Sequence, residues 1–373
     1  MSTKKALVVC LLFATVFSQI YLPKATFPGL SGYNLGFAIG QQFHQQIQNF
    51  VESNDDLTAL ELWATTSGSD LYNQIIANQN KFYPNYYQEL QGLAAGAEVD
   101  EMKIMLNNIV ADLAQYFEHV NDTQTITPRI RCSDVLLSSP GASVHGHNED
   151  DGSVYAKLNY LVETDNWVAY TYAAELPGNA FAWNPSHSLT YTMNSLFPYV
   201  TNLEGACQYF IMRDVIESTS TEDAKNRALK YPAFSGFSLN VADATTKLNI
   251  EVSAQPSETS GQTNAVTEAT TGVPLAHFNN YEQLDVLATN DTSSVYRMQT
   301  FTAMIGTGSI LDAEGVAHFL GNTTNANYPV FRRQSVWTLA TMITDWDQNT
   351  IEIYTDNPVT SSPTYTFTMS PSQ

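Results

Sequence analysis

The spacing of apolar residues changes once along this chain, near residue 120, and this change limits the folds that the sequence can adopt. Over 32–120, apolar residues recur at steps of mostly three and four, as in Ile39, Phe43 and Ile47 and again within 102–113. Side chains at this spacing share one face of a helix. The first third of the chain is therefore predicted to consist of amphipathic helices.

From residue 125 onward the sequence favours strands, because short segments rich in Val, Thr, Tyr and Phe lie between polar turns. The predicted strands are 153–162, 167–173, 188–193, 237–241, 248–252, 336–344, 350–355 and 364–369. One helical stretch, 209–229, interrupts them. Helices followed by strands, with few crossover helices, predict an α+β fold built in layers.

Two further segments have a distinct composition. The segment 89–100 is rich in glycine and other small residues, which predicts a closely packed turn between two helices. The segment 253–274 is rich in Ser, Thr, Gly and Pro and carries few large apolar residues, which predicts a long surface loop.

The N-terminus has the pattern of a secretory signal peptide over 1–19. Lys4 and Lys5 precede an apolar run at 6–17, and the small residue Ser18 follows near a cleavage point. The run is too short to span a bilayer, and no later segment has the length of a membrane helix. The mature protein is expected to be secreted or lysosomal, with no membrane association.

The net charge disfavours one class of partner and agrees with entry into the secretory pathway. Asp and Glu total 37 against 16 Lys and Arg, a net charge of -21 that disfavours binding to nucleic acid and suits an acidic compartment. Glycosylation sequons at Asn121, Asn290 and Asn322 are typical of a secreted glycoprotein.

Cysteine is scarce, and its placement raises the question of a reactive thiol. Cys10 lies in the predicted signal peptide, so the mature chain keeps Cys132 and Cys207. These two residues either form one disulfide or leave a free thiol for chemistry.

Cys132 follows a polar, proline-containing connector and begins an apolar segment, a context that suits a cleavage loop. Breaking the bond between Arg131 and Cys132 would place a thiol and an α-amine on one residue. The α-amine has a pKa of about 7.7 to 8.0, so it can take the thiol proton near neutral pH, and the thiolate can then attack an amide. The alternative is a small buried apolar cysteine.

The polar segment 145–152, HGHNEDDG, follows within two strand lengths of Cys132. A hairpin turning at 138–141 would bring Asp150 back beside the new amine, where its carboxylate would orient the ammonium group. A solvated acidic loop is the alternative. His145 and His147 also alternate, as ligands of a metal on one strand face would, so a metal-dependent hydrolase is a second alternative.

Three further side chains are candidates for the same site. Asn194 ends an alternating segment and Asn279 lies in the segment HFNNY, so either amide is a candidate donor to an oxyanion. Arg297 is the arginine we expect nearest the site. The alternatives are turn residues for the two asparagines and a surface ion pair for the arginine.

These motifs together give the chain a resemblance to the cysteine N-terminal-nucleophile hydrolases that include isopenicillin N acyltransferase and the N-β-alanyl amine (carcinine-type) hydrolases. The motifs occur in the order of that family and span most of the mature chain: GFAIGQQFHQQI (36–47), PNYYQELQGLAAGAEVD (84–100), RCSDVLL (131–137), GHNED (146–150), NAFAWN (179–184), YTMNSLFP (191–198), HFNNY (277–281) and TLATMITDWDQNTIEIYTDNP (338–358).

The resemblance implies a four-layer αββα sandwich made as a precursor and cut before Cys132. The helical segment 20–131 would become a small subunit, and the β-rich segment 132–373 a large one that stays associated with it. Asp150 matches the catalytic carboxylate of the family.

The resemblance also implies that Asn194 and Asn279 are oxyanion-hole candidates and that Arg297 is the family arginine. Arg131 and the segment after Asn279 depart from the family pattern, and a host protease is an alternative agent of the cut.

We therefore expect an amide-bond hydrolase or acyltransferase that acts on small N-acyl amines or amino acids and needs no cofactor. The alternatives are the metal-dependent hydrolase and a secreted binding protein without catalysis, which would remain one uncut chain.

Overall fold

The computed structural model describes residues 20–120 and 131–369. The predicted signal peptide and the sequon at Asn121 lie outside the described residues. The α-helices of the described part are α1 (Gly32–Gln42), α2 (His44–Ser53), α3 (Asp55–Thr65), α4 (Ser69–Phe82), α5 (Pro84–Ala97), α6 (Glu101–Asn107), α7 (Val110–His119), α8 (Gln208–Val215), α9 (Thr221–Ala228), α10 (Thr292–Gly306) and α11 (Ala313–Leu320).

The strands of the described part form two sheets. They are β1 (Lys24–Thr26), β2 (Arg131–Ser139), β3 (Ala142–Gly152), β4 (Tyr160–Glu163), β5 (Val168–Thr171), β6 (Phe181–Asn184), β7 (Leu189–Leu196), β8 (Gly236–Ala242), β9 (Lys247–Val252), β10 (Asn264–Glu268), β11 (Leu275–His277), β12 (Val336–Asp345), β13 (Thr350–Tyr354) and β14 (Tyr365–Thr368). An eight-stranded sheet has the order β1-β4-β5-β6-β7-β8-β9-β10, and a six-stranded sheet has the order β11-β2-β3-β12-β13-β14.

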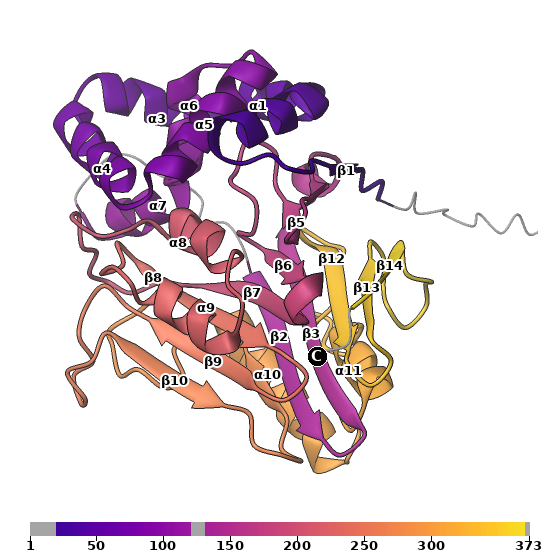
Figure 1. Cartoon of the computed structure of the whole chain (residues 1–373). Coiled ribbons are helices and arrows are strands. Elements are labelled where there is room, and N and C mark those ends of the chain that lie inside the picture. Colours follow the sequence, from indigo (N-terminus) through magenta and orange to yellow (C-terminus); the bar gives the residue numbers. More distant parts are fainter. Residues whose placement is uncertain (1–19, 121–130, 370–373) are drawn as a thin grey trace, which may run out of the picture.

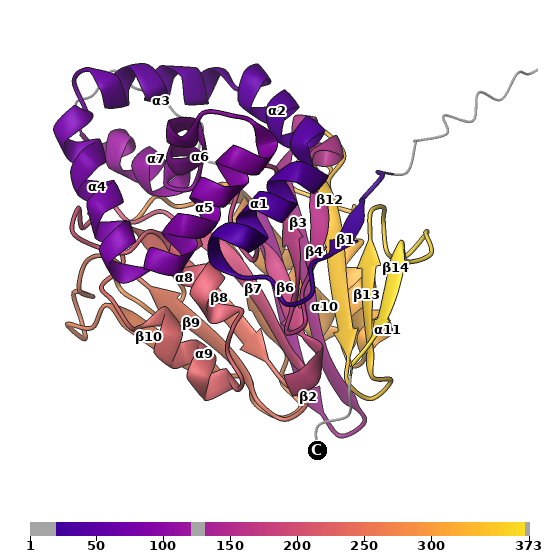
Figure 2. The same ribbon diagram turned by 45° about the horizontal axis from the view of Figure 1, so that its top comes forward.

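Three clusters of buried apolar side chains hold these elements together. The largest lies between the helices α1–α9 and one face of the eight-stranded sheet, with Leu113 and Tyr191 among its members. The second lies between the two sheets and includes Leu136 and Phe181. The third lies between the six-stranded sheet and α10 and α11, where Phe319 is buried. Figures 1 and 2 show α1–α7 as one group on the strands, with α10 and α11 away from it.

The helical pattern of the first third and most of the predicted strands are confirmed, and the mixed α+β class with them. The predicted turn at 89–100 is wrong, because most of it lies in α5. Its glycines serve helix packing: a Cβ on Gly92 would lie 2.0 Å from the carbonyl oxygen of Tyr33, and one on Gly36 would lie 1.8 Å from that of Glu89. The backbones of α1 and α5 are therefore in direct contact.

Two strand boundaries also differ from the prediction. The first part of 153–162 is a short 3-10 helix, Ser153–Lys157, because the chain leaves the six-stranded sheet after β3 and must turn to enter the other sheet at β4. The predicted loop 253–274 contains β10, which pairs with β9 alone at the sheet edge. An edge strand is half solvated, so its polar composition does not prevent pairing.

Candidate active site around Cys132

A hairpin places Cys132 at the start of a strand in the middle of the six-stranded sheet. Strands β2 and β3 pair from Ser139 opposite Ala142 to Arg131 opposite Asp150, and Gly141 in the turn has a φ of 78°. The predicted hairpin is thus confirmed. Successive side chains of a strand point to opposite faces. The register therefore decides which neighbours each side chain of the site meets.

The thiol of Cys132 faces the eight-stranded sheet and is fully buried. Directly opposite on β3 is Glu149, whose Oε2 lies 3.4 Å from Sγ. The hydroxyl of Tyr172 donates a 2.6 Å hydrogen bond to Oε1 of the same carboxylate. Burial raises the pKa of the Cys132 thiol well above its usual range, and the carboxylates of Glu149 and Asp134 raise this pKa further. In the uncut chain Cys132 is therefore a protonated thiol.

A row of buried polar side chains continues from Glu149 along the same face of the hairpin. His147 Nε2 lies 3.1 Å from Glu149 Oε2, and His147 Nδ1 lies 3.0 Å from Asp134 Oδ2. Burial opposes charging of His147, but Asp134 outweighs it and raises the pKa of His147 to about 10. His147 is thus an imidazolium between two carboxylates. His145 lies on the far side of Asp134, and burial lowers its pKa.

The backbone of Cys132 is held from the other side by Asn279 and Arg297. The backbone N–H of Cys132 donates a 3.0 Å hydrogen bond to Oδ1 of Asn279, which also accepts one of 2.9 Å from Nη2 of Arg297. Nη1 of Arg297 donates to the carbonyl oxygen of Cys132 and to the Ser133 hydroxyl. Arg297 is fully buried, and burial lowers its pKa to about 10.

Asp150 lies one position further along β3 and therefore on the opposite face from Glu149. Its Oδ1 accepts a 2.6 Å hydrogen bond from Thr338, while its Oδ2 lies 3.3 Å from Nε of Arg332. Oδ2 accepts no hydrogen bond from any residue that the structure describes. Burial raises the pKa of Asp150, although Arg332 and Arg297 oppose this. Because Asp150 pairs with Arg131, it lies at the amine end of Cys132.

The structure brings four of the five candidate residues to this corner of the hairpin: Cys132, Asp150, Asn279 and Arg297. Asn194 on β7 lies deeper, where its Nδ2 donates a 2.7 Å hydrogen bond to Asp134 and its Oδ1 accepts one from Asn240. Its amide is thus part of the polar row. The catalytic roles of all five residues remain predictions.

Glu149 and Arg332 also contact candidate residues, although no sequence motif pointed to either of them individually. Glu149 lies within the polar segment HGHNEDDG, and the pairing of its position with Cys132 appears only once the hairpin register is known. Arg332 stands next to Arg333 in a chain with only 16 basic residues, so the doublet was a signal that could have been used.

The structure also bears on the two alternative interpretations, a disulfide between the cysteines and a metal site that includes the histidines. Cys132 and Cys207 are both free and buried, so the structure contains no disulfide between them. The donor atoms of Cys132, His147 and Glu149 lie within 4.8 Å of one another, close enough to share a metal ion. Each of these donors is, however, already engaged in the hydrogen-bonded row, and both ring nitrogens of His147 have partners. The three side chains are thus held to one another by hydrogen bonds.

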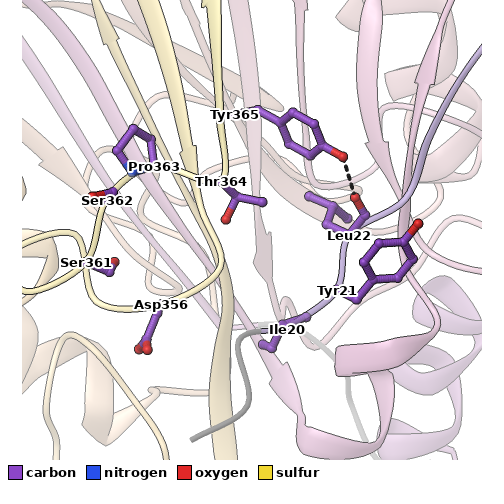
Figure 3. Close-up of a pocket in the computed structure, with 9 residues that line it drawn as sticks. All are labelled: Ile20, Tyr21, Leu22, Asp356, Ser361, Ser362, Pro363, Thr364 and Tyr365. Carbon is purple, nitrogen blue, oxygen red and sulfur yellow. Dashed lines mark hydrogen bonds between the residues drawn. The ribbon is translucent and has the colours of Figure 1, made fainter. Parts of the chain in front are cut away.

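Two cavities lie beside the N-terminal end of the described chain, at the same sheet as the site. One, of about 610 Å³, lies between the segment that begins at Ile20 and the loop before β14, where Tyr365 donates a hydrogen bond to the carbonyl of Leu22 (Figure 3). The other, of about 550 Å³, is lined by Arg333 and Trp337, among others. In the sequence these two residues lie between Arg332 and Thr338, which contact Asp150.

The lining of the second cavity is Ile20, Tyr21, Ser153, Val154, Ala156, Lys157, Arg333, Trp337, Thr355 and Asp356.

A buried cysteine with an asparagine and an arginine on its backbone and carboxylates nearby combines a candidate nucleophile with candidate bases and hydrogen-bond donors, the kinds of group that acyl transfer uses. Residues 138–360, more than half of the chain, match the family of acyl-coenzyme A:6-aminopenicillanic acid acyl-transferase. The chain belongs to this family of acyltransferases and amide hydrolases. The match begins within β2, just after Cys132.

The chain is also similar to a curated relative along most of its length. It is 27% identical over 365 residues to the beta-alanyl-dopamine/carcinine hydrolase of Drosophila melanogaster, covering 89% of this chain and 92% of that protein. The resemblance inferred from the motifs is thereby confirmed. Among the described residues, no helix has the length and apolar character needed to cross a membrane.

Proposed function

We propose that this protein is an amide-bond hydrolase or acyltransferase whose nucleophile is Cys132, freed as a new N-terminus by cleavage of the Arg131–Cys132 bond. The observation that supports it best is the set of contacts around Cys132. Its backbone N–H donates a hydrogen bond to Asn279, its carbonyl oxygen accepts one from Arg297, and its thiol is buried. The peptide nitrogen that contacts Asn279 would become the catalytic amine.

Each neighbour then has a chemical role. The new α-amine takes the thiol proton, since its pKa of about 7.7 to 8.0 suits a base near neutral pH. Asp150 holds the ammonium form, and its Oδ2 has the free acceptor capacity to do so. Asn194 or Asn279 stabilises the oxyanion by turning its amide N–H groups from their present acceptors, Asp134 and the carbonyl oxygen of Ser195, to the substrate. Of the two, Asn279 is the one in contact with Cys132. Water completes hydrolysis, and an amine acceptor completes transfer.

The finer fold assignment belongs to the same proposal. Helices on the outer face of each sheet, with an apolar cluster between the sheets, agree with the four-layer αββα sandwich of N-terminal-nucleophile hydrolases. The segments 20–131 and 132–373 would be the two subunits. Entry into the secretory pathway, with secretion or delivery to the lysosome, is part of the proposal. Asn290 is exposed and therefore accessible to glycosylation.

For the substrate we propose a small N-acyl amine, with β-alanyl amines as the first compounds to assay. The name of the Drosophila melanogaster relative supports this choice. The cavity beside Trp337 and Arg333 offers an aromatic ring and charged side chains near Asp150, which suits an amide with a polar acyl group.

The first test is the intact mass and N-terminal sequence of the wild-type chain and Cys132→Ala, both expressed through a secretory pathway. We expect a wild-type fragment that begins at Cys132 and a variant that stays whole. A folded wild-type chain that stays uncut would overturn the proposal and favour a binding protein. Cleavage of both chains would assign the cut to a host protease.

A second assay separates the proposal from a metal-dependent hydrolase that uses His145 and His147. An alkylating thiol reagent should abolish amide hydrolysis by the mature protein, whereas a chelator should leave it unchanged. The opposite pattern would support the metal enzyme.

A further inference from the structure

The uncut chain lacks the α-amine that serves as the base in the mature enzyme. Self-cleavage before Cys132 therefore needs another group to accept the thiol proton. Among the residues that the structure describes, Glu149 supplies the carboxylate in contact with Sγ, at 3.4 Å. Asp150, the carboxylate expected from the sequence, points to the other face of the sheet.

The carboxylate of Glu149 is held in the form that a base requires. Its two oxygens accept hydrogen bonds from the Tyr172 hydroxyl at 2.6 Å, from His147 Nε2 at 3.1 Å and from the Cys132 thiol. Three donors on two oxygens fit an ionised carboxylate, since a protonated one would itself have to donate. Glu149 and His147 are fully buried, so water does not compete for these contacts.

The rest of the polar row fixes this carboxylate in place. His147 bridges Glu149 to Asp134, and Asp134 is anchored by Thr192 at 2.5 Å and Asn194 at 2.7 Å. These contacts join β2, β3 and β7 across the space between the sheets. Such a network restricts the carboxylate to one position beside Sγ. His147 and Asp134 are thus positioning residues.

We infer that Glu149, held by His147 and Tyr172, is the general base that activates the Cys132 thiol for cleavage of the bond to Arg131. This inference rests on the proposed function and assigns its maturation step to a named carboxylate.

The step balances in protons and bonds. Glu149 takes the proton of Sγ as Sγ attacks the carbonyl carbon of Arg131. The bond from that carbon to the nitrogen of Cys132 breaks, and Glu149 returns the proton to this nitrogen, which becomes the α-amine. Arg131 is left as a thioester on Sγ, and water hydrolyses it to a carboxylate and a free thiol.

The test compares the rates at which full-length wild type and Glu149→Gln are cut before Cys132 after a pulse of secretory expression. A general base contributes on the order of 10²-fold or more, so we expect at least this slowing in the variant. Variant molecules that do become cut have the α-amine. They should therefore react with a thiol-directed acyl probe at a rate within a few-fold of wild type.

Two controls make the outcome decisive. Glu89→Gln perturbs a different buried ion pair and should lower stability without slowing the cut. Glu149→Asp keeps the charge but withdraws it from Sγ, and it replaces Glu149→Gln if that variant misfolds. Cutting of a folded Glu149 variant at the wild-type rate would overturn the inference. Equal losses in cutting and probe reactivity would overturn it too, because they indicate a structural role. An uncut wild type would instead refute the proposed function.

Discussion

At the scale of single residues, Asp112 on α7 is a buried carboxyl group whose hydrogen-bond donors in the described part of the chain are neutral. Ser235 donates to its Oδ1, and the backbone N–H of Gln208 donates to its Oδ2 at 3.2 Å. Burial raises its pKa from 3.8 to about 7, and these hydrogen bonds only partly oppose the shift. The folded protein therefore keeps a proton on Asp112 at a pH where the unfolded chain has lost it.

This shift predicts a pH-dependent free energy of unfolding. A raised pKa stabilises the fold fully below pH 3.8, and the gain is lost as pH rises to about 7. Between pH 5 and pH 8, the free energy of unfolding of the wild type should fall by roughly 3 kcal/mol more than that of Asp112→Asn. This follows from about 1.4 kcal/mol per pKa unit. Urea unfolding of both proteins at both pH values measures this. Parallel losses in the two proteins would show that Asp112 does not titrate in this range.

The geometry of a strand also explains why the adjacent residues Glu149 and Asp150 differ in role. Glu149 and Asp150 are neighbours in sequence, but the strand directs one to the thiol and the other to Arg332. A shift of the hairpin register by one residue would exchange them. The chemistry of the site therefore depends on the register that the turn at Gly141 sets.

At the scale of elements, the contact between α1 and α5 depends on the absence of side chains. An added Cβ on Gly36 would lie 1.8 Å from a backbone oxygen of Glu89, and one on Gly96 would lie 2.1 Å from that of Phe37. A backbone cannot yield as a flexible side chain can. The two helices would have to separate, and their packing on the sheet would change with them.

We therefore predict that Gly36→Ala and Gly96→Ala each lower the free energy of unfolding by about 3 kcal/mol, since overpacking of a close contact usually costs about 1–3 kcal/mol and sometimes more. Gly306→Ala, at the end of α10 where a Cβ meets nothing, is the matched control and should change stability by less than about 1 kcal/mol. Denaturant midpoints measure the series. Wild-type midpoints for the first two variants would contradict a backbone contact between α1 and α5.

At the scale of the whole molecule, the segments on either side of the proposed cut are joined by contacts that do not need the peptide bond. Strand β1 of the N-terminal segment pairs in parallel with β4 of the other, and Phe43 stacks on Tyr160 with ring centroids 3.8 Å apart. Glu89 of α5 and Arg213 of α8 form a buried ion pair at 3.0 Å. Arg213 also stacks on Trp167.

We expect the two segments of the cut protein to elute together in native size-exclusion chromatography and to separate only in denaturant. Glu89→Ala should lower the denaturant concentration needed for separation, because it removes the buried partner of Arg213 and leaves only the partly exposed Glu217 to pair with this arginine. Lys24→Ala removes a partly exposed ion pair with Glu163 across the same boundary, so it should change this denaturant concentration little. Separation of the native segments after the cut would contradict this prediction.

Much of this architecture follows from the sequence because it depends on neighbours along the chain. The period of apolar residues predicted the helices and the strands, and the Pro–Gly turn at 140–141 predicted the β2–β3 hairpin. Local signals also predicted where the polar residues near Cys132 would gather. The predictions were wrong where one local composition is compatible with two structures. The glycines at 89–100, for example, permit a turn and also a close contact between helices.

The tertiary structure alone decided which side chains meet. Asn279 and Arg297 lie far from Cys132 in sequence, and only the pairing of β11 with β2 and the packing of α10 bring them to its backbone. The sequence by itself determined the fold class, the candidate nucleophile and the acidic segment beside it. The register of two strands and the face of a sheet determined that Glu149, and not Asp150, contacts the thiol, because a strand separates adjacent side chains to opposite sides.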